Sequence, residues 1–140
     1  MPNKRSAIFP AEISCLGEVI RFVDGWSEEI RLANRRCYSL RLIVDELVSN
    51  ICRHGSVPEG ATVTLTLFQT DETIVLEIRD SGVPFNPLEH TEPDISSPLE
   101  ERSIGGLGLL LVRRLSQKMF YRREDNQNVQ TIVLDNRDDP

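Results

Sequence analysis

The sequence lacks three features that would each indicate a particular class of protein: a long hydrophobic run, an excess of positive charge and closely spaced cysteines. Its longest strongly apolar stretch, residues 107–112, is far shorter than the ~20 residues that a membrane-spanning helix needs. The formal net charge of −6 argues against a protein that binds DNA or an anionic membrane through bulk charge. We therefore expect no direct nucleic-acid partner and no membrane partner.

Only three cysteines are present, and their wide spacing matches neither a disulfide framework nor a Cys/His metal site. The first residues carry charges but lack the apolar core of an export signal, so we expect a reduced, cytoplasmic protein. A chain of 140 residues with 39% hydrophobic content can bury about two-thirds of its unfolded surface. We expect a single domain over residues 1–140, with a frayed tail at 135–140.

Apolar residues recur at helical spacing in three segments. The first predicted helix covers 11–32, with Gly25 as a candidate break and Asn34 as a candidate stop. The second runs from about 36 to 54, where Gly55 is a natural C-terminal cap. A glycine-rich stretch at 104–108 opens the third, which runs to about Lys118.

Between the second and third helices the period of the hydrophobic pattern changes to two, which predicts strands over 61–69 and 73–80. Further strands are expected at 6–9, 119–123 and 129–134, the last two around a turn at 125–128. A long polar loop covers 81–103. The resulting order of elements predicts an α+β protein: a two-layer sandwich with a mixed, mostly antiparallel sheet and the helices on one face.

The second predicted helix carries a polar stripe beside its apolar one. Glu46, Asn50 and His54 lie at i, i+4 and i+8 and approach the buried edge. Buried polar groups without partners cost roughly 1–3 kcal/mol each, so a ligand between helix and sheet would explain the stripe. The alternative is a solvated stripe in which His54 interacts with the C-terminal end of the helix dipole.

Two glycine motifs follow the second helix. The first is Asp80-Ser81-Gly82 at the end of a strand, where a carboxylate could accept from an adenine amine and the glycine would let a flat group approach; a plain hairpin turn is the alternative. The second is the stretch 105–108 at a helix start, where backbone N–H groups could bind phosphate; an ordinary glycine turn is the alternative. Neither motif is specific alone.

Taken together and in order, the three motifs resemble those of the GHKL (Bergerat) ATP-binding fold. Glu46, Asn50, Arg53 and His54 resemble its N box. The segment 80–85 resembles its first glycine box, and 105–109 its second. With Pro84 and Phe85 following the first box, the sequence is similar to bacterial anti-sigma factor serine/threonine kinases, which are histidine-kinase-like ATPases.

This resemblance implies ATP and Mg²⁺ as cofactors. Asn50 would hold the metal, Glu46 would act as general base or orient the attacking hydroxyl, and Arg53 would bind phosphate. Asp80 would accept from the adenine amine, and the loop at about 87–103 would be the ATP lid. The remaining positions that the resemblance assigns to the nucleotide site are His54, Gly82, Pro84, Phe85, Gly105, Gly106, Leu107, Gly108 and Thr131.

The function implied by the resemblance is an anti-sigma factor kinase. It would phosphorylate a STAS-type anti-sigma factor antagonist, sequester a sigma factor and thereby regulate transcription; relatives of this kind commonly form homodimers. The alternative is a non-catalytic nucleotide-binding partner-switching module, suggested by Gly105 where relatives carry a basic residue and by the acidic lid. A detached histidine-kinase catalytic domain is a further option. A basic cluster is either a solvated face or a docking patch for an acidic partner: Arg113, Arg114, Lys118, Arg122 and Arg123.

Overall fold

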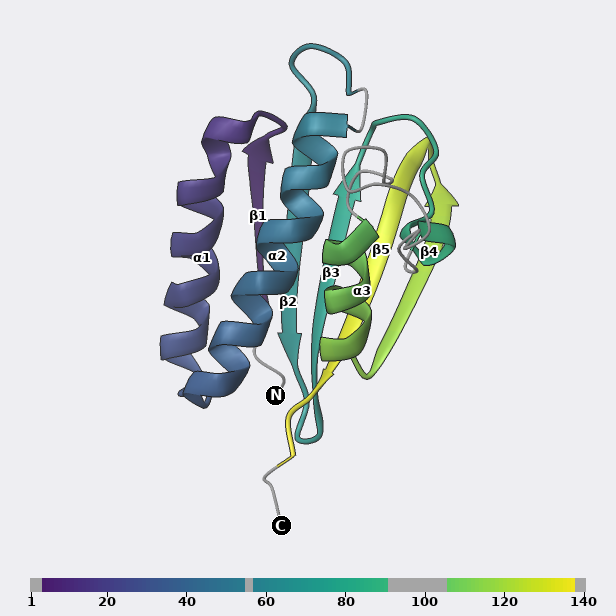
Figure 1. Cartoon of the computed structure of the whole chain (residues 1–140). Helices are drawn as coiled ribbons and strands as arrows, with labels where there is room; N and C mark the ends of the chain where they lie inside the picture. Colours follow the sequence, from purple (N-terminus) through teal and green to yellow (C-terminus); the bar gives the residue numbers. More distant parts are fainter. Residues whose placement is uncertain (1–3, 55–56, 91–105, 138–140) are drawn as a thin grey trace.

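The computed structural model describes residues 4–54, 57–90 and 106–137 (Figure 1). Most of the predicted lid, together with Gly55 and Gly105, therefore lies outside the described residues. No helix in the described part of the chain has the length and apolar character needed to span a membrane. The elements are β1 (Lys4–Pro10), η1 (Ile13–Cys15), α1 (Leu16–Glu29), α2 (Asn34–His54), β2 (Thr62–Gln69), β3 (Thr73–Asp80), η2 (Pro87–His90), α3 (Gly106–Leu115), β4 (Lys118–Glu124) and β5 (Gln127–Asp135).

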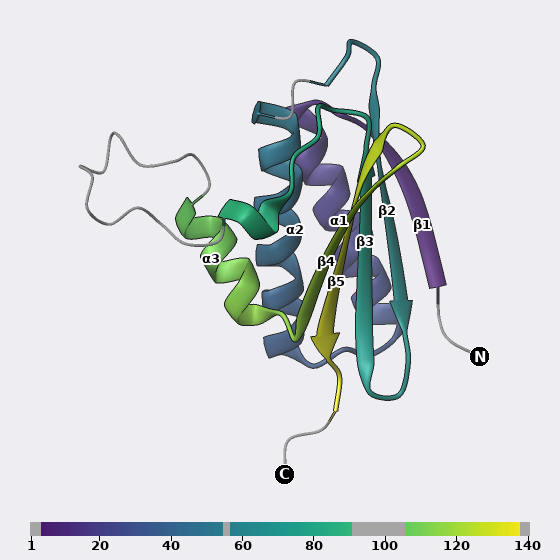
Figure 2. The same ribbon diagram turned by 90° about the vertical axis from the view of Figure 1, so that its right-hand side faces the viewer.

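The five strands form one sheet in the order β1-β2-β3-β5-β4, and the helices cover one face of it (Figure 2). The predicted two-layer α+β sandwich is thus confirmed. The sheet was expected to be mixed, but each pair of neighbouring strands among the described residues is antiparallel. Residues directly opposite one another on neighbouring strands therefore point to the same face of the sheet, and successive residues along a strand alternate between the two faces. This alternation determines which side chains meet the helices.

The hydrophobic core fills the space between the sheet and the helices. On β2 and β3 every second residue is buried, and these residues face Val19 and Val23 of α1 and a stripe on α2. The buried positions of α2 follow the predicted spacing and include Leu40, Val44 and Leu47. Burial of this alternating set against one helical layer explains why the register is unique.

The ends of the helices differ from the predictions in three places. The first helix begins as the short η1 turn, and α1 then continues through Gly25 without a break. Arg31, with a φ of 57°, makes the turn that separates α1 from α2, so Asn34 is the first residue of α2 and not a stop. The third helix ends at Leu115, and Lys118 already belongs to β4.

The turn between β4 and β5 is shorter than predicted. Asp125 and Asn126 both have positive φ, 50° and 63°, which is the geometry of a two-residue hairpin turn that matches the twist of the strands. The prediction of a turn over 125–128 is therefore wrong for residues 127 and 128, which belong to β5. Asn128 is a strand residue with an inward side chain. At the other end, β5 extends to Asp135, whose carbonyl accepts a hydrogen bond from the Arg36 guanidinium.

Candidate functional site between the helices and the sheet

Among the described residues, the buried side chains on the helix-facing side of the sheet are apolar except where β3, β5 and β4 meet. There, strand pairing places Asp80, Asn128 and Arg123 in one row and Ile78, Gln130 and Tyr121 in the next. We call Asp80, Asn128, Gln130, Tyr121 and Arg123 the polar corner. Three of its members are almost fully buried, which is unusual for polar side chains without a functional reason.

Asp80 is 2% exposed at the end of β3. Its Oδ1 accepts hydrogen bonds from the Gly82 backbone N–H at 2.9 Å and from Asn128 Nδ2 at 3.2 Å. Burial raises the pKa of the Asp80 carboxyl, although these two hydrogen bonds and the Arg123 charge act in the opposite direction. Because both bonds go to one oxygen, the carboxylate keeps acceptor capacity for a ligand.

Asn128 holds the loop that follows β3. Its Nδ2 donates to Asp80 and, at 2.8 Å, to the carbonyl of Val83. Its Oδ1 accepts from the Phe85 N–H at 3.1 Å and from the Tyr121 hydroxyl at 2.6 Å. Arg123 adds a bond to the Gly82 carbonyl at 2.8 Å. The position of the loop therefore depends on one asparagine whose two donors and acceptor oxygen are all in use.

Our sequence analysis missed Asn128 and Gln130. The sequence predicts Asn128 in the turn at 125–128 and Gln130 in the strand at 129–134, and it assigns neither residue a role. A signal was nevertheless available: in β5 these two residues continue the alternation of Ile132 and Leu134, which are core positions. Polar side chains at inward positions of a strand indicate either a polar network or a ligand.

A second cluster forms where α2 packs against α3. Asn50 Nδ2 donates to Glu46 Oε1 at 3.1 Å, as their i, i+4 spacing on one helix allows. Gly108 of α3 lies directly on the Glu46 carboxylate, because a Cβ built at this glycine would overlap it. The absence of a side chain at Gly108 thus lets the carboxylate approach the first turns of α3. The structure brings Glu46, Asn50 and Gly108 together from two distant motifs.

The end of α2 also passes close to the polar corner. Burial raises the pKa of the Cys52 thiol to about 12, and the neighbouring Cys15 and the charge of Asp80 act in the same direction. Cys52 follows Asn50 by two residues, so the helix that carries the Glu46–Asn50 pair passes within electrostatic range of the Asp80 carboxylate.

The donor set of the second cluster fits Mg²⁺. Because Asn50 uses its amide nitrogen to bind Glu46, its Oδ1 remains as an oxygen ligand beside a carboxylate. Mg²⁺ prefers oxygen ligands and needs only one or two from the protein when phosphates and waters supply the rest. No group of three or more His, Cys, Asp or Glu side chains that could hold a metal occurs within the described residues, so a fully protein-made metal site is not found there.

The other predicted site residues lie as follows. Arg53 and His54 are exposed in the last turn of α2, and Pro84 and Phe85 are exposed on the loop after β3. Gly106 is the first residue of α3, and Leu107 follows it in the same turn. Thr131 is not brought to this region: it pairs with Glu77, so it lies on the sheet face opposite to Asp80. The inward position is taken by Gln130.

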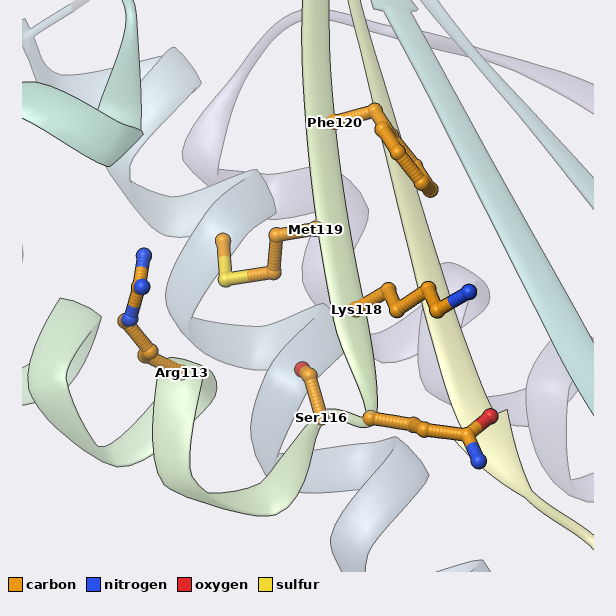
Figure 3. A pocket seen from close by; sticks show the side chains of 6 residues that line it. Arg113, Ser116, Lys118, Met119 and Phe120 are labelled. Carbon is orange, nitrogen blue, oxygen red and sulfur yellow. The ribbon is translucent and has the colours of Figure 1, made fainter.

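A separate hollow of about 280 Å³ lies at the junction of α3 and β4. Figure 3 shows Arg113 on α3, Ser116 in the link between α3 and β4, and Lys118, Met119 and Phe120 along β4. None of its lining residues belongs to the polar corner or to the Glu46–Asn50–Gly108 cluster. We therefore place the candidate site by its hydrogen bonds and burial and not by this hollow.

Comparison with known sequences connects these clusters to a family. Residues 9–134 match the model of the histidine kinase-like ATPase domain. The chain is 33% identical over 117 residues to the serine/threonine-protein kinase BtrW of Bordetella bronchiseptica, covering 83% of this chain and 78% of the relative. It is 24% identical over 127 residues to the serine-protein kinase RsbW of Halalkalibacterium halodurans, covering 88% and 78%.

Comparison with solved structures concerns the fold alone. The RsbU and RsbW domains of Rv1364c from Mycobacterium tuberculosis match with a TM-score of 0.65 at 15% identity, over 94% of this chain and 32% of that one. The present chain thus spans about a third of that longer protein. The catalytic domain of the histidine kinase ThkA matches with a TM-score of 0.55 at 20% identity, over 96% and 99%.

Proposed function

This chain belongs to the histidine kinase-like ATPase domain family, and we propose on that premise that it is an ATP-dependent serine/threonine protein kinase of the anti-sigma factor type. Both sequence relatives described above are named as serine or serine/threonine protein kinases. In this proposal the γ-phosphoryl group of ATP passes to a serine or threonine of a STAS-type anti-sigma factor antagonist. The same chain sequesters a sigma factor when unphosphorylated antagonist is scarce.

The observation that carries the proposal is the contact of Gly108 with the Glu46 carboxylate, which also accepts a hydrogen bond from Asn50. Phosphoryl transfer depends mainly on positioning and on compensation of charge, so the groups around the phosphates must be held closely. A carboxylate and an amide oxygen, set against the start of a glycine-led helix, provide such an arrangement. The N-terminal backbone N–H groups of α3 add a favourable environment for phosphate.

Each cluster has a distinct role in this proposal. Glu46 accepts the proton of the attacking hydroxyl or orients that hydroxyl, and Asn50 Oδ1 would hold the metal. Mg²⁺, if bound there, would supply positive charge that compensates the charge developing on the phosphates during transfer. Arg53, exposed at the end of α2, supplies a cation to the phosphates. Asp80 accepts a hydrogen bond from the adenine amine, and Gly82 leaves room for the base.

The non-catalytic switching module is the less favoured candidate, because the named relatives are kinases. Its motivating features were Gly105 and the acidic lid, and most of these residues lie outside the described part of the chain. The two functions differ in one measurable respect: a switching module binds nucleotide without transferring phosphate.

The test is a transfer assay with purified chain, γ-labelled ATP, Mg²⁺ and the antagonist encoded by a neighbouring gene. We expect label on the antagonist, and a loss of at least about 10-fold in rate for Asn50→Ala and Glu46→Gln. Asp45→Asn is the matched control, because Asp45 adjoins Glu46 in sequence but is exposed. Transfer that persists unchanged in Asn50→Ala would contradict the proposal, and calorimetric ATP binding without any transfer would favour the switching module.

A further inference from the structure

The polar corner contains a buried acceptor atom to which none of the described residues donates a hydrogen bond. Gln130 is 4% exposed, and within the described residues its Oε1 has no hydrogen-bond partner. Asn128, two residues earlier on the same strand and face, makes four hydrogen bonds. A buried carbonyl oxygen without a donor destabilises the folded chain, so its retention needs a reason outside the protein's own hydrogen bonding.

The position of Gln130 indicates what that reason is. It pairs with Ile78 on β3, and Asp80 pairs with Asn128, so Gln130 and Asp80 are diagonal neighbours on the helix-facing side. Diagonal neighbours of this kind lie about 7–8 Å apart at Cα, which long side chains can bridge. Two acceptors, the Asp80 carboxylate and Gln130 Oε1, therefore share one buried corner beside the end of α2.

We infer that Gln130 is a specificity-determining residue that accepts the second hydrogen of the adenine amine. The inference rests on the proposed ATP function and concerns how the base is read. An exocyclic amine has two hydrogens, and in this arrangement Asp80 accepts one while Gln130 Oε1 accepts the other. A glutamine carboxamide is complementary to adenine, whereas guanine presents a carbonyl oxygen in place of that amine. Guanine would therefore place an acceptor against two acceptors.

The test compares ATP with N6-methyl-ATP, in which a methyl group replaces one of the two amine hydrogens. In calorimetry with Mg²⁺, we expect the wild-type chain to bind N6-methyl-ATP about 5- to 20-fold more weakly than ATP, the range for one lost hydrogen bond plus a misplaced methyl. Gln130→Leu should bind ATP more weakly by about fivefold or more and should bind the two nucleotides within about twofold of each other. Such a loss of discrimination identifies Gln130 as the partner of the second hydrogen.

Gln69→Leu is the matched control, because it makes the same chemical change at the far end of β2, where Gln69 pairs with Ile74. It should keep the wild-type preference for ATP. Thr131→Val tests the neighbouring residue on the opposite sheet face. A loss of ATP affinity in Thr131→Val together with unchanged affinity in Gln130→Leu would overturn the inference.

Thermal unfolding of the nucleotide-free chain separates recognition from a structural role. Because Leu removes an acceptor that has no donor, Gln130→Leu should unfold at the wild-type temperature or above it. A lower unfolding temperature combined with the wild-type ratio of ATP to N6-methyl-ATP affinity would show a structural glutamine and overturn the inference. A wild-type chain that binds no ATP at all would instead refute the proposed function, which distinguishes the two failures.

Discussion

The helix-facing side of the sheet has two regions built on opposite principles. Over β2 and the first part of β3 its buried side chains are all apolar, and Leu65, Leu67 and Leu76 have no exposed surface. At the polar corner, the buried side chains are Asp80, Asn128 and Gln130. The apolar region gains stability from burial alone, whereas each polar group of the corner loses its hydration and must find a partner.

The comparison of the two regions shows that the polar corner contributes less to the stability of the folded chain than the apolar region does. Asn128 compensates its own burial and that of part of Asp80 through four hydrogen bonds. Asp80 still has a raised pKa, and Gln130 Oε1 has no partner among the described residues. Apolar side chains at these positions would make the folded chain more stable. The polar corner is therefore the place to expect a ligand.

The largest effect is expected in the apolar region. Leu65→Ala removes a fully buried side chain from β2 and leaves a cavity, which should lower the free energy of unfolding by about 2–5 kcal/mol. Leu111→Ala is the control, because Leu111 is 42% exposed on α3 and should cost much less. Urea denaturation measures both. Equal losses would show that the apolar region is not tightly packed.

The next effect is expected at the centre of the polar corner. Asn128→Ala removes four hydrogen bonds, including those to the Val83 carbonyl and the Phe85 N–H, so we expect a loss of about 2–3 kcal/mol in unfolding free energy. ATP affinity should fall with it, because the loop after Asp80 is released. Asn136→Ala, which removes a single bond to the Thr70 carbonyl, is the comparison. A loss in Asn128→Ala no larger than in this control would refute the central role of Asn128.

A smaller effect on stability, but a clear one on activity, is expected at the contact between α2 and α3. Gly108→Ala would displace the Glu46 carboxylate, which is the mobile end of a side chain, so unfolding free energy should change by less than about 1 kcal/mol. The rate of phosphoryl transfer should fall at least about 10-fold. In Gly25→Ala, where a Cβ meets nothing within 4 Å, transfer should stay unchanged. Full transfer activity in Gly108→Ala would contradict the proposed role of Glu46 in catalysis.

The smallest effect concerns pH. Since burial raises the pKa of Asp80 above its value of 3.8 in an unfolded chain, ionised Asp80 costs stability at neutral pH. That cost disappears as pH falls through the raised pKa towards 3.8, because the folded state takes up its proton first. Asp80→Asn keeps an oxygen acceptor for Gly82 but carries no charge.

We therefore expect Asp80→Asn to be at least as stable as the wild type at pH 7. The difference in unfolding free energy between the two should shrink as pH is lowered towards 4, while the variant binds ATP weakly throughout. Urea curves at several pH values measure this, with Asp71→Asn in the exposed β2–β3 turn as the control substitution. A difference that widens on acidification would contradict the role of burial at Asp80.

Much of the fold could be predicted because local patterns determined it. The alternation in β2 and β3 and the stripe on α2 each report their own buried face, and the order of elements follows from them. The expected break at Gly25 and stop at Asn34 were wrong because a weak local preference was overridden by packing and by the turn at Arg31. Element boundaries depend on such contacts more than element types do.

What the sequence alone determined is the identity of the elements and the residues of the three motifs, since these depend on spacing along a helix or strand. Only the tertiary structure decided that Gly108 touches Glu46 and that Asn128 and Gln130 face inward while Thr131 faces away. The physical reason is that a two-residue turn fixes the register of β5, and a shift of one residue exchanges the two faces of a strand. Chain spacing therefore identifies the motifs, but strand pairing decides which side chains reach the ligand.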